Sequence, residues 1–194
     1  MAWQEKSSMA VWAVSNCVTP GKREDYVLEL VNHVTVDVYG LCGSYECPKN
    51  SSTLCYREFS KQYFFYLSFE NSICKDYVTE KLFAVLKYDI IPVVFGGGNY
   101  SLLAPPGSYI DALSFSSPKH LADHMKKVSS NFSLYAKYFE WKRTHEVTIN
   151  DFRTESYCSL CEKLHRASFK EQTLSADPFN WWVTKSQCQE WSNY

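Results

Sequence analysis

The feature that most constrains the fold of this chain is an apolar run that passes straight into a polar, helix-opening segment. The residues from Tyr63 to Phe69 are rich in aromatic side chains and predict a buried strand. Further on, apolar residues recur at helical spacing, at Val78, Leu82, Phe83 and Leu86. We expect Asp76 to cap this helix. A buried strand followed closely by a helix is typical of parallel sheets covered by helices.

The rest of the chain repeats this alternation. We expect strands at Met9 to Ser15, Val34 to Tyr39, Ile90 to Phe95 and Tyr109 to Leu113. We expect helices at Glu24 to His33, from Pro118 onward, at Ser133 to Lys142 and at Asp151 to Arg166, and a cross-linked loop at Gly40 to Tyr56. The predicted fold class is α/β, a Rossmann-like, mostly parallel sheet with helices on both faces. We divide the chain into an N-terminal extension (1–9), the α/β domain (10–166) and a C-terminal tail (167–194) that packs on the domain.

Composition excludes several classes of protein. The chain has 194 residues, of which 45% are hydrophobic, so it can bury a core. A net charge of −1 gives no electrostatic footprint for nucleic acid or an anionic membrane. No run approaches the roughly 20 apolar residues of a membrane span, and the first residues lack the apolar core of a signal peptide.

Cysteines and glycosylation sequons point to the secretory pathway. The eight cysteines are Cys17, Cys42, Cys47, Cys55, Cys74, Cys158, Cys161 and Cys188. Sequons begin at Asn50, Asn99 and Asn131. The alternative is a cytosolic protein with chance sequons and reduced or metal-bound cysteines, which explains fewer of these features. A secreted character without a signal predicts a fragment, or an alternative product, of something longer. The Cys-x-x-Cys spacing at 158–161 favours a disulfide over zinc, because no second such pair follows it.

Adjacent charges at Glu80 and Lys81 open the helix that follows the central strand. Helix N-termini beyond the carboxyl ends of parallel strands attract phosphate, and Lys81 adds a positive charge there. Glu80 would repel phosphate, so it needs a sugar hydroxyl or a cation. The pair therefore indicates a ligand that carries both phosphate and ribose. Its alternative interpretation is a solvated helix face.

Arg23, at the expected start of the first helix, is suited to grip phosphate oxygens and could converge with Lys81 on one pyrophosphate. Taken alone, it fits a solvated helix start better. Gly96-Gly97-Gly98 is a weak phosphate-loop signal and better fits a turn with positive φ. No Asp-x-Asp motif is present to hold a nucleotide through a metal, so we expect a metal-independent site.

Together these residues resemble a known family. The motifs Tyr66 to Ser72, Asp76 to Lys81 and Pro92-Val93-Val94 are similar to the donor-binding signature of the α-1,3-fucosyltransferases, glycosyltransferase family 10. The resemblance extends in order from about Val11 to His165 and is nearest to the invertebrate branch. Further matching segments are Val11 to Cys17, Val36 to Gly40, Pro105 to Ile110, Ser117-Pro118, Tyr138 to Trp141 and Cys158-x-x-Cys161.

The resemblance implies a C-terminal, GDP-fucose-binding domain, one of the two Rossmann-like halves of a GT-B enzyme. It implies that Arg23 and Lys81 neutralise the pyrophosphate, that Glu80 binds the ribose hydroxyls and that Tyr77 lines the phosphate end. Ser15, Asn16, Tyr66 and Asn71 would complete the nucleotide pocket. It leaves the disulfides open: Cys42 could bridge to Cys47, and Cys158 could bridge to Cys161 or to cysteines of the other domain.

The implied reaction is inverting transfer of fucose from GDP-β-L-fucose to an N-acetylglucosamine of an N-glycan or N-acetyllactosamine acceptor, in α-1,3 linkage and without a cofactor. The family's general base lies in the N-terminal acceptor domain, to which no part of this chain corresponds, so the catalytic residue stays unknown. The family resides in the Golgi lumen on an N-terminal membrane anchor, which this sequence lacks. The alternatives are a catalytically inactive nucleotide-sugar-binding fragment and, far behind, an extracellular binding domain unrelated to nucleotides.

Overall fold

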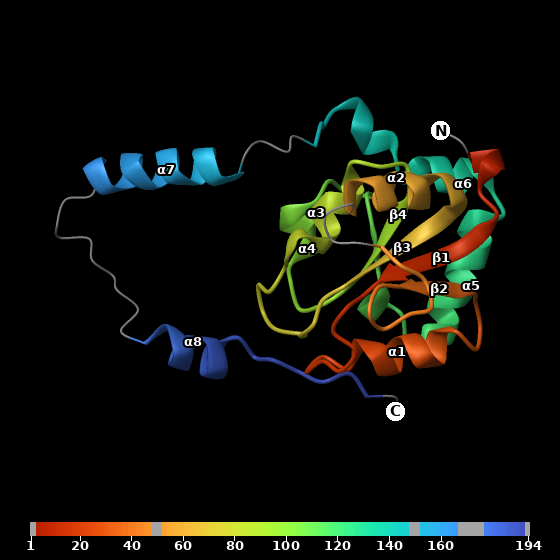
Figure 1. The fold of residues 1–194 in the computed structure, drawn as a ribbon, viewed down its shortest axis with the longest axis horizontal. Helices are drawn as coiled ribbons and strands as arrows, with labels where there is room; N and C mark the ends of the chain where they lie inside the picture. Colours follow the sequence, from red (N-terminus) through yellow and green to blue (C-terminus); the bar gives the residue numbers. More distant parts are fainter. Residues whose placement is uncertain (1–2, 48–51, 148–151, 167–176, 193–194) are drawn as a thin grey trace.

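The computed structural model describes residues 3–47, 52–147, 152–166 and 177–192 (Figure 1). Its strands are β1 (Ser8–Ala13), β2 (Val36–Tyr39), β3 (Tyr63–Phe69), β4 (Ile91–Phe95) and β5 (Ile110–Asp111). Its α-helices are α1 (Arg23–Leu30), α2 (Ser52–Gln62), α3 (Glu80–Leu86), α4 (Tyr100–Leu103), α5 (Pro118–Ser129), α6 (Phe132–Lys137), α7 (Phe152–Arg166) and α8 (Pro178–Lys185). Short 3₁₀ helices form at Trp3–Glu5, Ala112–Ser114 and Glu140–Arg143.

The strands form one sheet in the order β2-β1-β3-β4-β5, and every pairing in it is parallel. Side chains of β1 alternate between two hydrophobic cores, as the pleat of a strand requires. Ala10, Trp12 and Val14 join the core that α1 and α5 cover, whereas Val11 joins the core that α2 and α3 cover. The predicted α/β fold with helices on both faces is therefore confirmed.

Besides the short α4, two helices, α2 and α8, lie where we expected none from the sequence. We expected a loop as far as Tyr56, but α2 begins at Ser52. Its Tyr56 and Phe59 pack with Val11 and Tyr66 against the sheet, so tertiary burial overrides the weak helix propensity of its serine, threonine and cysteine residues. The second unexpected helix is α8, which Asp177 caps by accepting a hydrogen bond from the Asn180 amide at 3.0 Å.

The residues before β1 and the tail at 188–191 both contact the α/β domain. Trp3 packs its ring against Phe64 and Phe132, with centroids 6.3 and 5.7 Å away. At the other end, the Gln189 amide donates to the Ile73 carbonyl at 2.8 Å, and the Trp191 ring lies 5.1 Å from Tyr26. Cys188 and Gln189 of the tail therefore lie against the loop that follows β3, and Trp191 lies against α1.

Lys6 is an unusual buried cation at the amino end of the sheet. Its ammonium donates to the carbonyls of Ser60 and Tyr63, and only 7% of the residue is exposed. Burial lowers the pKa of Lys6 from 10.5 to about 8, although the field of Asp89 opposes this shift.

We expect this burial to make the free energy of unfolding rise with pH between about 8 and 10.5. In that window the unfolded chain keeps the Lys6 proton while the folded chain has released it. Urea denaturation at several pH values should show a rising stability that Lys6→Met lacks. Equal pH dependence in both proteins would contradict the expectation.

Six cysteines form three disulfides, Cys17–Cys42, Cys47–Cys55 and Cys74–Cys188. The local Cys42–Cys47 bridge considered from the sequence is wrong, because each of these residues pairs elsewhere. Cys158 and Cys161 are free and exposed on α7, so they do not bridge to each other. The sequence could not resolve these pairings, because spacing alone does not fix connectivity.

Two of the three sequon asparagines fall within the described residues. Asn99 and Asn131 are both exposed, and the Asn131 side chain caps α6 by accepting from the Leu134 amide at 3.1 Å. Asn50 lies outside the described residues. Glycosylation at these positions remains a prediction. None of the helices described is long and apolar enough to cross a membrane.

Candidate functional site

The residues predicted to bind a ligand gather at the carboxyl end of the sheet. The chain leaves β1 for β2 on one side and returns to β3 on the other, so the winding reverses between β1 and β3. Ligands of open α/β sheets bind at such a reversal point, beyond the carboxyl ends of the strands. Ser15 and Asn16 follow β1, Asn71 follows β3, and the starts of α1 and α3 bring Arg23, Glu80 and Lys81 to the same edge.

A buried carboxylate, Glu70, organises this edge. It is 1% exposed and directly follows β3. It accepts from the Thr79 amide at 2.7 Å, from the Thr79 hydroxyl and from the Lys81 ammonium at 2.9 Å. Lys81 also donates to the Thr79 hydroxyl at 2.8 Å, and the Ser68 hydroxyl donates to its carbonyl. The Lys81 ammonium is therefore fixed in place and only partly exposed.

This network corrects two expectations about the start of α3. Asp76 does not cap the helix: its φ is +60°, and Thr79 occupies the cap position with extended backbone. The Thr79 amide is also not free for a phosphate, because Glu70 accepts from it. The acceptor of the Thr79 amide instead comes from the end of β3, a relation that local sequence patterns do not reveal. Glu70 lies within the segment that we expected to form the site, but we assigned it no role from the sequence.

Arg23 is buried, at 3% exposed, and is not the solvated helix start that it could have been. Its guanidinium donates to the Phe69 carbonyl at 2.6 Å and to the Asn16 carbonyl at 3.1 Å, and it lies 5.5 Å from the centroid of the Trp12 ring. Its Nε has no hydrogen-bond partner. Burial lowers the pKa of Arg23, while Glu24 and Glu70 oppose this effect. Arg23 thus ties the ends of β1 and β3 together, with one N–H still unsatisfied.

Glu80 and Tyr66 lie on the side of the sheet that α2 covers. Glu80 is exposed, and its charge helps to raise the pKa of Tyr66, after the larger effects of burial and of the neighbouring Tyr56. Tyr66 is 3% exposed and its ring packs edge-on against Tyr56 at 5.5 Å. Glu80 is therefore accessible to a ligand, whereas Tyr66 is buried.

Asn71 and Tyr77 belong to the loop that joins β3 to α3. The Asn71 carbonyl accepts from the Gly21 amide at 2.8 Å, and the Tyr77 ring packs edge-on against Trp182 at 5.6 Å. Both residues are half-buried. They hold this loop against the start of α1 and against α8, so the tail takes part in shaping the edge.

The same loop explains the three glycines after β4. The turn interpretation expected positive φ, but among the described glycines positive φ occurs at Gly40 and Gly107. A Cβ at Gly97 would lie 2.5 Å from the Cys74 carbonyl oxygen, and one at Gly98 would lie 2.1 Å from the Val78 side chain. Gly97 and Gly98 are thus required for close approach of the β3–α3 loop, and this contact is packing, not a phosphate loop.

A hollow of about 500 Å³ adjoins the reversal point. It is lined by Ser15 and by residues of the loop 40–47, including Tyr45 and Glu46. The Cys17–Cys42 disulfide joins this loop to the segment after β1, and Cys47–Cys55 joins it to α2. Sequence reasoning identified this segment as a cross-linked loop without recognising a cavity. Its size is within the range of small-ligand sites.

The chemistry of this edge suits an anionic ligand that also carries hydroxyl groups. Lys81 offers a fixed ammonium, Arg23 a buried positive charge and Glu80 an exposed acceptor. Within the described parts of the chain, no three His, Cys, Asp or Glu residues are grouped closely enough to hold a metal ion. The described residues offer hydrogen bonds and charge, with Ser15 and the loop 40–47 providing space for a flat or bulky group.

Comparisons with known proteins agree on one family. Residues 3–182 match the model of glycosyltransferase family 10 (fucosyltransferase), C-terminal part. Over 188 residues the chain is 42% identical to alpha-(1,3)-fucosyltransferase C of Drosophila melanogaster, covering 96% of this chain and 43% of that protein. Over 146 residues it is 38% identical to GDP-fucose protein O-fucosyltransferase 3 of Danio rerio, covering 71% of this chain and 32% of that protein.

A solved structure shares the fold. A crystal structure of an alpha1,3-fucosyltransferase with GDP-fucose superposes with a TM-score of 0.64 at 19% identity, covering 84% of this chain and 48% of that one. The chain thus spans less than half of the length of each of these proteins.

Proposed function

Since this chain belongs to glycosyltransferase family 10, the fucosyltransferases, we propose that it forms the donor-binding half of an enzyme that transfers fucose from GDP-β-L-fucose. The observation that carries the proposal is the Glu70–Lys81 network at the reversal point of the sheet. A preorganised ammonium beside an exposed carboxylate matches the diphosphate and ribose of a nucleotide sugar.

Each predicted residue takes a role that its position allows. Lys81 contacts the pyrophosphate, and Arg23 adds positive charge from beneath the surface. Glu80, being exposed, accepts from the ribose hydroxyls. Ser15, Asn16, Tyr66, Asn71 and Tyr77 shape the surrounding pocket. The hollow beside Ser15 is large enough for the guanine base.

For the reaction, we propose inverting transfer in α-1,3 linkage to an N-acetylglucosamine of a glycan, without a metal or organic cofactor. Inversion requires a general base on the acceptor side, and we place that base in the part of the relatives that this chain does not cover. The protein O-fucosyltransferase name of the Danio relative raises a second acceptor class, a protein hydroxyl. Because both kinds of relative use fucose, the donor assignment does not depend on this choice.

The compartment we propose is the Golgi lumen, with a membrane anchor outside this sequence. Three disulfides among the described cysteines support an oxidising compartment, since such bonds rarely persist in the cytosol.

Titration calorimetry with GDP and GDP-fucose tests the donor site. We expect Lys81→Ala to weaken binding at least tenfold, since loss of a charge-assisted phosphate contact costs about 1.5–3 kcal/mol. Arg23→Ala should weaken binding too. Because Arg23 is buried, circular dichroism must show that this variant is folded. Lys87→Ala, outside the site, is the matched control. Undetectable binding by the folded chain, or binding that Lys81→Ala leaves unchanged, would reject the assignment.

A transfer assay separates an enzyme half from an inactive binding fragment. Labelled GDP-fucose with an N-acetyllactosamine, N-glycan or folded-protein acceptor should yield product only when the acceptor-binding part of a relative is supplied. Appreciable transfer by this chain alone would place the base within it and would overturn that division of roles.

A further inference from the structure

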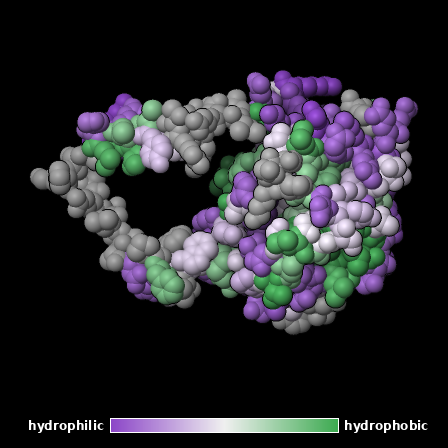
Figure 2. Space-filling model, in the orientation of Figure 1, coloured by the Kyte–Doolittle hydropathy of each residue, from purple (hydrophilic) through white to green (hydrophobic). Residues whose placement is uncertain are grey.

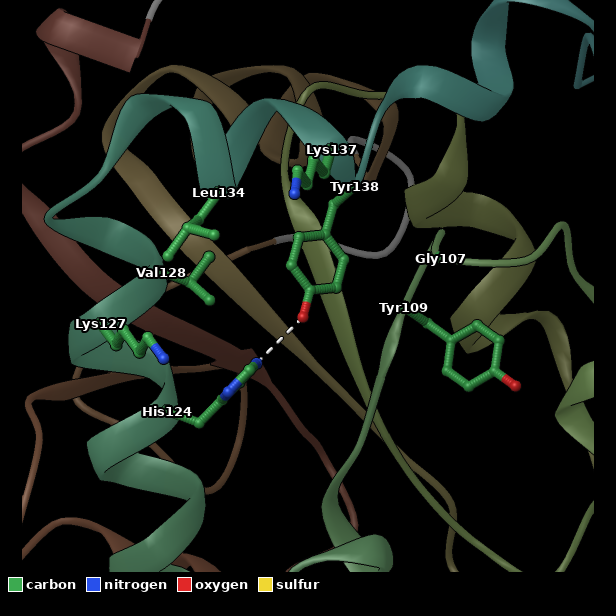
Figure 3. A pocket seen from close by; sticks show the side chains of 8 residues that line it. All are labelled: Gly107, Tyr109, His124, Lys127, Val128, Leu134, Lys137 and Tyr138. Carbon is green, nitrogen blue, oxygen red and sulfur yellow. Dashed lines mark hydrogen bonds between the residues drawn. The ribbon is translucent and has the colours of Figure 1, made fainter.

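A second cavity lies away from the carboxyl end of the sheet, between α5, α6 and the segment that enters β5 (Figure 3). It measures about 370 Å³. Tyr109, one of its lining residues, immediately precedes β5, whereas the donor edge follows the carboxyl ends of β1 and β3. The cavity is therefore a separate feature from the donor site, and the proposed function leaves it unused.

Basic side chains from two helices face this cavity, which we call the α5–α6 pocket. Lys127 and His124 come from α5, and Lys137 comes from α6 (Figure 3). None of the described residues that line it is acidic. Other lysines of the chain have carboxylate partners, such as Lys119 with Asp123 at 2.8 Å and Lys142 with Asp89 at 2.8 Å. Within the described residues, no such ion pair is found for Lys127 or Lys137, so their charge is available to a ligand.

A hydrogen bond fixes the centre of the pocket. His124 Nε2 and the Tyr138 hydroxyl are 2.9 Å apart, and they link α5 to α6 (Figure 3). Burial, and then the charge of Lys127, lower the pKa of His124. The imidazole thus lies in a positive field that an anion would relieve. Lys137, Tyr109 and Tyr138 are the other titratable groups that line the pocket, and the centroid of the Phe115 ring lies 5.3 Å from that of the imidazole.

Apolar groups line the remainder of the pocket. Val128 and Leu134 lie beside the Tyr138 ring (Figure 3). A volume of 370 Å³ corresponds to roughly a dozen water molecules, so it admits more than a bare ion. The lining therefore suits a ligand with two parts. A negatively charged group would bind between the two ammoniums and the imidazole, and the rest of the ligand would pack on the aliphatic and aromatic side chains.

We propose that the α5–α6 pocket binds a small organic molecule through a tetrahedral oxyanion, a phosphate or sulfate ester, held by Lys127, Lys137 and His124. The two esters present the same geometry and charge-assisted acceptors. The α5–α6 pocket is separate from the donor site, so this proposal can be tested independently of the proposed function.

Nuclear magnetic resonance of the imidazole nitrogens tests this proposal on the ¹⁵N-labelled chain. Glucose 6-phosphate and a 6-sulfated N-acetylglucosamine are titrated separately at constant ionic strength, each against its uncharged parent sugar. We expect a saturable shift of the His124 signals with at least one ester and a rise of the His124 pKa, because a bound anion favours the imidazolium. The stronger of the two titrations identifies the ester.

The variant Lys127→Gln/Lys137→Gln should weaken that binding at least tenfold and leave GDP affinity unchanged. Both side chains are exposed, so the fold should tolerate the change. Lys119→Gln, on the same helix but paired with Asp123, is the matched control and should bind as the native chain does. Non-saturable shifts for both esters, shifts that the parent sugars reproduce, or equal affinity in the double variant would overturn the proposal.

Discussion

Glu70→Ala is expected to lower the free energy of unfolding by about 3–5 kcal/mol, because it leaves a buried ion pair without one partner. In the native chain the Glu70 carboxylate satisfies the Thr79 amide, the Thr79 hydroxyl and the Lys81 ammonium. Without it, these donors lose their acceptor at an edge that is closed to water on the Glu70 side. Urea denaturation under non-reducing conditions measures the loss.

The amide variant separates charge from hydrogen bonding. Glu70→Gln keeps an acceptor for Thr79 but removes the charge that holds Lys81, so we expect a smaller loss of stability than with alanine. GDP affinity should still fall, because the ammonium is no longer fixed for a phosphate. Glu80→Gln changes a neighbouring, exposed carboxylate and should leave stability within about 0.5 kcal/mol of native. Equal stability of Glu70→Ala and native chain would show that the network contributes nothing to the fold.

Replacing both Cys74 and Cys188 with serine should cost about 4–5 kcal/mol, the amount expected for cross-links that close loops of about 100 residues. The bond joins positions 114 residues apart and anchors the tail beside the loop after β3. Removing the bond raises the conformational entropy of the unfolded chain, because the two ends of this long loop are no longer held together. We also expect the Ile73–Gln189 pairing to open, which hydrogen exchange at these amides detects.

The Cys47–Cys55 bond provides the matched control. Its partners are 8 residues apart, so removing it should cost less than about 3 kcal/mol on the same entropic argument. Denaturant midpoints of the two double variants, measured side by side, give the comparison. A loss for the Cys74–Cys188 variant no greater than for the short loop would contradict the loop-length explanation.

The central strand was predictable because its signal is local. The bounds of β3, Tyr63 to Phe69, agree with the apolar run, and Ser117 and Pro118 begin α5 through capping chemistry that is written in adjacent residues. The start of α3 was not predictable in this way, since Glu70 holds the amide of its N-cap residue, Thr79. A carboxylate that serves a distant amide has no periodic pattern, and only the folded loop brings it there.

The positions of the candidate site residues in the fold were predictable for a topological reason. Residues that follow parallel strands meet at one edge, so Ser15, Asn71 and Lys81 lie there once the alternation of strands and helices is recognised. Whether each of these side chains is buried or exposed was not predictable. Arg23 is buried between two strand ends, and Glu80 is exposed, because side-chain burial depends on packing between segments far apart in sequence.

The anchoring of the tail also determines when the candidate site at the carboxyl edge of the sheet can be completed during synthesis. Cys74 emerges from the ribosome 114 residues before its partner, which at typical translation speeds is a delay on the order of ten seconds. Throughout that interval its thiol is open to exchange with other cysteines. Cys74 must therefore remain available for pairing until Cys188 has been made, and only then can the loop that shapes the edge close.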